Sequence, residues 1–109
     1  MIKDSDILEN PVVRKAIVTL QNGDARAWLS LFVKNAILYD HGNEMTAGGF
    51  IEKSIGREYF TSIDKTEDEG FSVFGSFHTD QWGDFKARFS FQLNKKGKIN
   101  RLEVSQAAY

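Results

Sequence analysis

The sequence contains no cysteine, one proline and two histidines among its 109 residues. Without cysteine the chain can form neither a disulfide framework nor a thiolate that acts as a nucleophile or metal ligand. Two histidines fall short of the three or four converging ligands that a metal site requires. We therefore expect no metal site, and we expect no bound cofactor.

Neither sign of charge is in excess, since 14 basic residues face 15 acidic ones and the net charge is −1. The chain therefore lacks the basic surface typical of nucleic-acid binding. No apolar run approaches the roughly 18 residues that a membrane span needs. The first ten residues contain three acids and no apolar segment of a secretion signal. We expect a cytoplasmic protein that binds neither nucleic acid nor membrane.

Aromatic residues are abundant, with nine Phe, three Tyr and two Trp making up 13% of the chain. The hydrophobic share of 41% and the charged share of 27% are typical of a globular protein. The length predicts a single domain over residues 1–109. Such a domain must build its one core largely from aromatic side chains.

A first helix is predicted after Asn10. Asparagine is a favoured N-cap, and Pro11 suits the first helical position. Gly23 is typical of the left-handed residue that ends a helix. The apolar face of this helix would consist of Val13, Ile17 and Leu20.

A second helix is predicted to begin directly after Asp24, which can cap it. Its apolar face at helical spacing would be formed by Trp28, Leu31 and Phe32. The apolar run 36–39 then predicts a strand, and this strand ends on the carboxylate of Asp40.

The middle of the chain has weaker signals. Residues 41–49 contain three glycines and no period, which predicts a loop, and 50–53 predict a short extended segment. A third helix is predicted over 57–63, because Tyr59, Phe60 and Ile63 follow a helical spacing. The acidic run 64–70 is typical of a solvated turn.

Three strands are predicted in the last forty residues, over 71–78, 84–93 and 98–107, with a turn at 94–97. Alternation places one side of the middle strand in the core. That side consists of Phe85, Ala87, Phe89, Phe91 and Leu93. Helices gathered on one face of an antiparallel sheet make an α+β domain.

A four-residue turn also predicts the register of the last two strands. It pairs Leu93 with Lys98 and so sets apolar residues opposite apolar ones and a cation opposite an anion. The resulting pairs are Phe89 with Leu102, Ala87 with Val104, and Arg88 with Glu103.

Taken together, five segments resemble the nuclear transport factor 2-like superfamily, in particular its small SnoaL-like members, over nearly the whole chain. They are QNGD (21–24), WLSLF (28–32), NAILYD (35–40), GREYF (56–60) and FKARFSFQLNKKGKINRLEV (85–104). The resemblance implies a cystatin-like, cone-shaped sheet wrapped by about three helices. It also implies a pocket for a small hydrophobic molecule at the open end, and a homodimer.

The superfamily includes ketosteroid isomerases, and the resemblance places Asp40 where these enzymes keep their general base. Their two oxyanion-hole positions fall on Ala16 and Phe89, neither of which can donate a side-chain hydrogen bond. Two functions therefore stay open. One is a non-catalytic module that binds a small hydrophobic ligand, and the other is an isomerase, cyclase or hydrolase that uses Asp40 as general base.

Asp40 is the candidate catalytic residue, because desolvation among aromatic side chains would raise its pKa. The alternative is a strand-end carboxylate that faces water or caps a backbone N–H. His41 is a candidate at the mouth of the pocket, or else a solvated loop residue, and in a continued strand it would point away from Asp40. Parity places His78 on the outer face of the sheet, away from Phe77.

Eight aromatic residues can either line a pocket or fill the core: Trp28, Tyr59, Phe71, Phe77, Trp82, Phe85, Phe89 and Phe91. Gln106 lies on the inner parity of the last strand and adds a polar group there. The candidate ligand-binding residues are Trp28, His41, Tyr59, Phe77, Phe85, Phe89 and Gln106. Phe74 is an apolar residue on the outer face, which favours a homodimer contact through that face.

Overall fold

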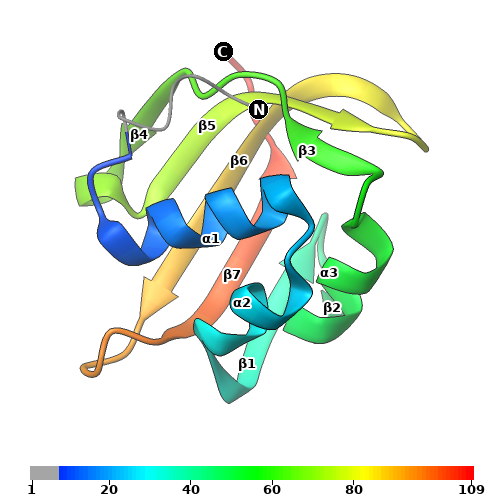
Figure 1. The fold of residues 1–109 in the computed structure, drawn as a ribbon. Coiled ribbons are helices and arrows are strands. Elements are labelled where there is room, and N and C mark those ends of the chain that lie inside the picture. Colours follow the sequence, from blue (N-terminus) through cyan, green and yellow to red (C-terminus); the bar gives the residue numbers. More distant parts are fainter. Residues whose placement is uncertain (1–7) are drawn as a thin grey trace.

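A computed structural model describes residues 8–109 (Figure 1). Its helices are α1 (Pro11–Asn22), α2 (Ala25–Ser30) and α3 (Ala47–Ser54). Its strands are β1 (Phe32–Asp40), β2 (Asn43–Met45), β3 (Glu58–Phe60), β4 (Lys65–Glu67), β5 (Ser72–Thr79), β6 (Gly83–Leu93) and β7 (Ile99–Gln106), and a short 3-10 helix, η2, spans Asp68–Gly70.

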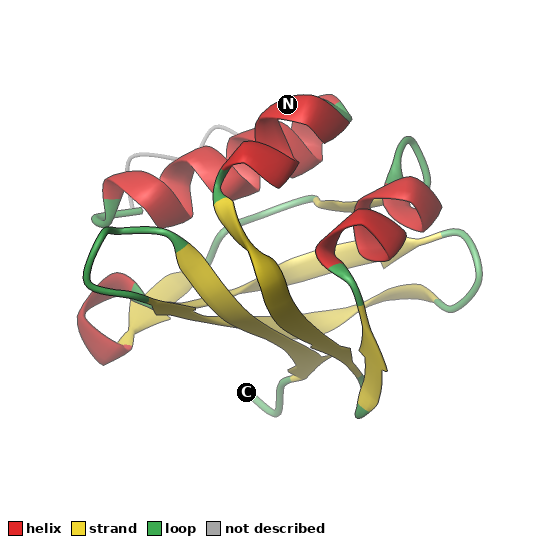
Figure 2. Ribbon diagram, turned by 90° about the horizontal axis from the view of Figure 1, so that it is seen from below, coloured by secondary structure: helices red, strands yellow, loops and turns green. Residues whose placement is uncertain are grey.

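The strands form one curved sheet, and all three helices lie on the same face of it (Figure 2). We call this the inner face and the opposite one the outer face. The strand order is β2-β1-β7-β6-β5-β3, and β4 also pairs with β5. The α+β prediction is confirmed. The sheet is mixed rather than fully antiparallel, because β1 runs parallel to β7 while the other pairs are antiparallel.

The two predicted N-terminal helices form where their capping residues indicate. The side chain of Asn10 accepts hydrogen bonds from the backbone N–H of Val12 and Val13 at 2.9 and 3.2 Å. Gly23 ends α1 with a left-handed φ of 66°. Asp24 caps α2 by accepting from the Ala27 N–H at 3.1 Å.

The third helix lies earlier in the chain than the sequence predicted. Residues 41–49 are not a loop, since they contain β2 and the start of α3, while the expected helix over 57–63 contains β3 instead. Thr46 caps α3 by accepting from the Gly49 N–H at 2.9 Å. Burial of Phe50 and Ile51 on the inner face outweighs the low helix propensity of two glycines.

The register of β6 and β7 also differs from the prediction. Phe89 pairs with Val104 and Phe91 with Leu102, two residues away from the expected partners. The connection holds five residues, since Leu93 pairs with Ile99, and an irregularity next to this pair shifts the ladder by one more. An offset of two leaves every side chain on its predicted face.

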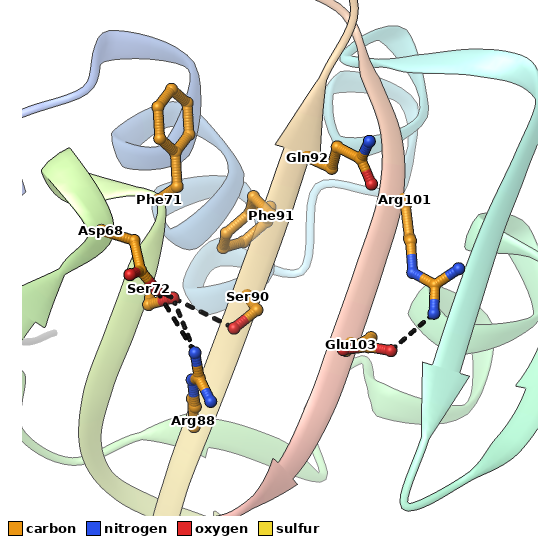
Figure 3. Close-up of a pocket in the computed structure, with 9 residues that line it drawn as sticks. All are labelled: Asp68, Phe71, Ser72, Arg88, Ser90, Phe91, Gln92, Arg101 and Glu103. Atoms are coloured by element: carbon orange, nitrogen blue, oxygen red, sulfur yellow. Dashed lines mark hydrogen bonds and ion pairs between the residues drawn. The ribbon is translucent and has the colours of Figure 1, made fainter.

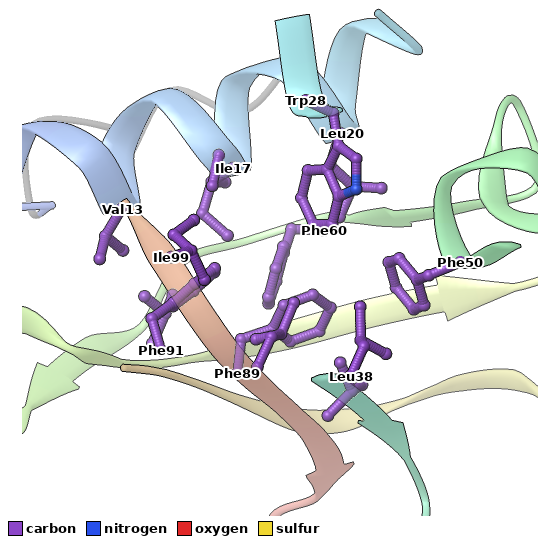
Figure 4. Packing of buried hydrophobic residues seen from close by; sticks show 14 of the residues in the cluster. Val13, Ile17, Leu20, Trp28, Leu38, Phe50, Phe60, Phe89, Phe91 and Ile99 are labelled. Carbon is purple, nitrogen blue, oxygen red and sulfur yellow. The ribbon is translucent and has the colours of Figure 1, made fainter. Parts of the chain in front are cut away.

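Aromatic side chains fill the space between the helices and the inner face (Figure 4). Phe89 is fully buried, and its ring centroid lies 4.9 Å from that of Phe60 and 5.2 Å from that of Phe77. The side-chain amide of Gln21 ties α1 to β3, because it donates to the Phe60 carbonyl at 2.8 Å and accepts from the Phe60 N–H at 2.7 Å. This part of the cone is closed and packed.

Gly75 lies in β5, where the segment between β3 and β4 crosses very close to the strand. A Cβ atom at this position would lie 2.0 Å from the Ser62 carbonyl oxygen, a contact that no side chain tolerates. Glycine is therefore required by the close approach of two backbones rather than by a turn.

The outer face carries charged side chains and the C-terminal residue. Phe74 is only 8% exposed, so the prediction of an exposed phenylalanine on this face is wrong. The ring of Tyr109 covers Phe74 edge-on at a centroid distance of 5.8 Å, and Lys65 lies over the Phe74 ring at 4.8 Å. The Tyr109 hydroxyl donates to Asp64 Oδ2 at 2.6 Å, and Lys86 Nζ donates to the same oxygen at 2.8 Å.

None of the helices within residues 8–109 is both long enough and apolar enough to cross a membrane.

Candidate functional site

A groove of about 750 Å³ opens at one end of the sheet, beside the packed core. It lies where the ends of β1 and β7 meet β2, α3 and the turn between β5 and β6. Its walls are formed by Asp40, His41, Asn43, Met45, Lys53, Gln81, Trp82, Asp84, Phe85 and Gln106. The lining combines three apolar side chains with acidic, basic and amide groups.

Asp40 and His41 form a hydrogen-bonded pair at the base of this groove. β1 ends at Asp40, and His41 and Gly42 both have positive φ, 53° and 85°, which makes a tight two-residue turn into β2. The turn brings His41 back toward its neighbour, so its Nδ1 lies 2.9 Å from Asp40 Oδ1. The expectation that the two side chains point apart is wrong, because the strand does not continue through His41.

Lys53 of α3 neutralises Asp40 from the other side. Its Nζ lies 2.6 Å from Asp40 Oδ2 and 3.3 Å from Glu58 Oε2. The Asp40 side chain is 14% exposed and that of Lys53 is 38% exposed, so the carboxylate is shielded from water while the ammonium stays partly open to it. Burial disfavours the charged ammonium, but the hydrogen bonds and charges of Asp40 and Glu58 outweigh it and raise the pKa of Lys53. Asp40 is thus one member of a charge network, not a lone desolvated acid.

The opposite wall is the turn between β5 and β6. The Thr79 hydroxyl accepts from the Trp82 N–H at 2.8 Å and donates to the Gly83 carbonyl at 3.2 Å, which fixes the turn. Trp82 is 72% exposed although it lines the groove. Phe85 contacts the His41 ring edge-on at a centroid distance of 5.6 Å and joins this wall to the base.

His78 lies outside the groove, on the side of β5 that parity indicates. Its Nδ1 lies 2.6 Å from Asp84 Oδ1 and its Nε2 lies 3.1 Å from Asp80 Oδ1. These hydrogen bonds, first that of Asp84 and then that of Asp80, raise the pKa of His78. The ring of Tyr59 packs against His78 at a centroid distance of 5.0 Å.

The structure divides the sequence-predicted site residues into two groups. Asp40, His41, Phe85 and Gln106 line the groove together. The other four lie away from it: Trp28, Phe77 and Phe89 in the core and Tyr59 on β3. Trp28 is fully buried and donates its indole N–H to the Ala47 carbonyl at 3.1 Å.

Six groove residues were not among the candidate site residues from sequence: Asn43, Met45, Lys53, Gln81, Trp82 and Asp84. Of these, Trp82 had been named only as an aromatic residue that could line a pocket or fill the core. Lys53 was missed because the segment 50–53 was assigned as extended, whereas in α3 its side chain reaches Asp40. Thr46 could have indicated this helix, because it is a good N-cap and is followed by apolar residues at helical spacing.

A smaller hollow of about 270 Å³ lies on the outer face (Figure 3). Of the residues that line it, Ser72 donates from Oγ to Asp68 Oδ2 at 2.6 Å, and Arg88 Nη2 lies 3.3 Å from the same carboxylate oxygen. Arg101 is paired with Glu103 at 2.7 Å. These polar groups bind one another, so we take the larger groove as the candidate site.

Within the described part of the chain, no group of three or more acidic, histidine or cysteine side chains is placed to hold a metal ion.

No protein-family model matches the sequence, and a search of curated proteins finds no similar one. Solved structures do match. A nuclear transport factor 2-like protein of unknown function from Cytophaga hutchinsonii superposes with a TM-score of 0.71 at 16% identity, over 88% of this chain and 87% of that one. The protein has the nuclear transport factor 2-like fold. Other matched structures are described as cystatin-like, as the sequence predicted.

Two further matches are proteins with more specific descriptions. A putative polyketide cyclase from Sinorhizobium meliloti has a TM-score of 0.72 at 15% identity, over 88% of this chain and 94% of that one. The orange carotenoid protein of Anabaena, solved with canthaxanthin, has a TM-score of 0.72 at 18% identity. The match covers all of this chain but 38% of the carotenoid protein. At these identities the likeness concerns the fold alone.

Proposed function

We propose that the protein is a single ligand-binding domain whose groove takes a small hydrophobic molecule. One observation carries the proposal, namely a groove of about 750 Å³ with Met45, Trp82 and Phe85 in its walls. This volume falls within the range of roughly 300–1,000 Å³ typical of small-molecule sites. The amides of Asn43 and Gln106 add donors and acceptors that can orient a bound molecule.

Fold relatives support this proposal, since one of them binds a carotenoid in a structure that contains this fold. A ligand of the groove would meet apolar surface on the β5–β6 turn and polar groups at the end of β1. That division suits an elongated molecule with an apolar body and one polar end.

The test is a titration with the neutral fluorescent probe N-phenyl-1-naphthylamine. We expect saturable binding with one probe per chain and a rise in probe emission. Gln106→Trp places a bulky side chain in the groove and should weaken binding about tenfold or more. Leu29→Ala, which changes an exposed apolar residue outside the groove, is the control and should bind as the unaltered protein does.

Unsaturable binding, or equal affinity in Gln106→Trp, would contradict the proposal. Far-ultraviolet circular dichroism of the variant shows whether its fold is kept, so a folding defect is not mistaken for loss of a site.

The catalytic alternative rests on Asp40 as a general base, and the Asp40–His41 pair favours it, because an aspartate that holds an imidazole is a common base arrangement. Against it, the two oxyanion positions Ala16 and Phe89 are fully buried in the core and provide no donor. We therefore rank ligand binding above catalysis. Asp40→Asn should leave probe affinity within about threefold and abolish any base-dependent turnover.

We also propose that the protein forms a cytoplasmic homodimer through the outer face. Phe74 no longer supports this contact, but Ile37 on the same face is 39% exposed next to Tyr39. Sedimentation at micromolar concentration should give twice the chain mass of 12.4 kDa, and Ile37→Asp should give the monomer. A monomer of the unaltered protein would contradict the proposal.

A further inference from the structure

The charges that line the groove do not balance. Asp40 and Asp84 contribute two carboxylates, and Lys53 contributes the one lysine or arginine charge among the described residues that line the groove. Lys53 is also shared, because its Nζ contacts Glu58 at 3.3 Å as well as Asp40 at 2.6 Å. The base of the groove thus holds one cation between two anions and presents a surplus of negative charge.

Among the described residues that line the groove, no lysine or arginine is free to bind an anionic ligand. The ammonium of Lys53 already donates to two carboxylates, and a bound carboxylate would have to displace one of them or approach both. Like charges at such short range cost free energy in a shielded site. The electrostatics therefore disfavour a carboxylate or phosphate in the groove.

On the turn side, one further carboxylate, that of Asp80, lies near Asp84. Asp84 and Asp80 share the single imidazole of His78, at 2.6 and 3.1 Å. Even when His78 is protonated, two carboxylates face one positive charge. Asp84 also lines the groove, so a ligand seated there would lie beside one of these carboxylates, whose Oδ1 is paired with His78 outside the groove.

The aromatic walls complete the argument. Trp82 lines the groove and is 72% exposed, so much of its ring is open to an approaching molecule. Indole is the strongest of the aromatic side chains in attracting a cation to its face. Phe85 supplies a second ring at the same wall. Aromatic faces next to unbalanced carboxylates are the chemistry that recognises ammonium groups on an apolar frame.

We propose that the groove is selective for organic cations, that is, amines or quaternary ammonium compounds with an apolar body. The ammonium group would lie between Trp82 and Asp84, and the apolar part would lie along Met45 and Phe85. This inference rests on the proposed function, because it names the class of ligand for the same groove.

The experiment compares three probes with one carbon frame and different charge: 4-phenylbutylamine, 4-phenylbutanol and 4-phenylbutyrate. Binding is measured by calorimetry at neutral pH and low ionic strength. The amine should bind about tenfold or more tighter than the carboxylate, with the alcohol between them. The preference for the amine should shrink in high salt, because salt screens partly exposed charges.

Two variants locate the selectivity. Asp84→Asn should lower the affinity ratio of amine to alcohol about threefold or more. Trp82→Leu keeps an apolar surface but removes the ring, so it should weaken the amine more than the alcohol. Glu69→Gln removes one exposed negative charge outside the groove and is the matched control, expected to leave the ratio unchanged.

The outcomes separate this inference from the proposed function. Equal binding of amine and carboxylate, or an unchanged ratio in both Asp84→Asn and Trp82→Leu, would overturn selectivity for cations while leaving a groove that binds apolar molecules. Failure of all three probes to bind would overturn the proposed function itself.

Discussion

The two faces of the sheet are built by different forces. The inner face is closed by apolar burial, with Phe89, Leu38 and Leu102 fully removed from water. On the outer face an apolar residue, Phe74, is also covered, but by Tyr109 and the long side chain of Lys65, which are themselves exposed. Removing packed atoms from the inner face should therefore lower the free energy of unfolding far more than removing an ion pair from the outer face.

The comparison also explains where a ligand site can form. On the outer face Arg88 and Asp68 are paired with each other, and Ser72 donates to the same Asp68 oxygen. At the end of the inner face the aromatic packing stops, and Trp82 remains exposed. The groove lies at the end of the sheet, where the packed core ends.

Phe89→Ala should give the largest effect, because it removes a ring from the centre of the inner face. A large-to-small change of this kind costs about 3–5 kcal/mol of unfolding free energy. Urea denaturation measures this loss, provided that the unfolding free energies of the variant and the unaltered protein depend on urea concentration with the same slope. A loss below about 1 kcal/mol would mean that Phe89 does not lie in a packed core.

Gly75→Ala tests the inner side near the sheet edge. The added methyl would lie 2.0 Å from the Ser62 carbonyl oxygen, so the backbone must shift, and we expect a loss of about 1–3 kcal/mol. Ser76→Ala at the next position is the control and should change stability little. Equal stability of the two variants would show that the backbone of residues 61–64 shifts at little cost in free energy.

Asp64→Asn tests how much the charged Asp64 on the outer face stabilises the fold, because that contribution depends on pH. Hydrogen bonds from Lys86 and Tyr109 lower the pKa of Asp64 from 3.8 to about 2. A lowered carboxylate pKa adds stability above the unfolded value, and this contribution is lost as pH falls toward the folded value. The variant should therefore be less stable at neutral pH by at most about 1 kcal/mol.

That difference should close between about pH 4 and pH 2, where the unaltered protein also loses the charge. Chemical denaturation at a series of pH values follows it, with Glu52→Gln as a control at an exposed site on α3. A difference that stays constant down to pH 2 would exclude the charge of Asp64 as its cause.

Trp82→Ala should have the smallest effect on stability, within about 0.5 kcal/mol, because the side chain is mostly exposed on a turn. The same change should abolish most ligand binding. Trp28→Ala gives the opposite pattern, since Trp28 is fully buried and hydrogen-bonded in the core. If Trp82→Ala proves strongly destabilising, the turn is part of the core rather than a wall of the groove.

The fold was predictable where local chemistry and burial agree. Asn10, Gly23 and the alternation of β6 define their elements directly. The third helix was missed because its capping threonine is followed by two glycines, and propensity alone does not reveal that Phe50 is buried against the core. The register was two residues off because the connection holds five residues rather than four and because the irregularity at Gln92 and Leu93 depends on long-range pairing that the sequence pattern does not encode.

The candidate site was predictable only in part. Asp40 and His41 were found because they end a strand, but their contact depends on a positive φ at His41 that a non-glycine residue rarely adopts. Lys53 was not predicted as a site residue, because its contact with Asp40 requires α3, which the sequence did not predict. Buried aromatic residues such as Phe77 could not be told from wall residues such as Phe85, since both lie on the same face of the sheet.

The parallel contact between β1 and β7 has a consequence for how the protein is made. β1 is synthesised early, yet the strand that satisfies its free edge appears only after β2 to β6 have been translated. Until then β1 has only the short strand β2 as a sheet neighbour, and a two-stranded hairpin is barely stable in water. Contacts this distant in sequence also slow folding. A chain that has not yet reached β7 therefore carries β1 with one sheet edge still open.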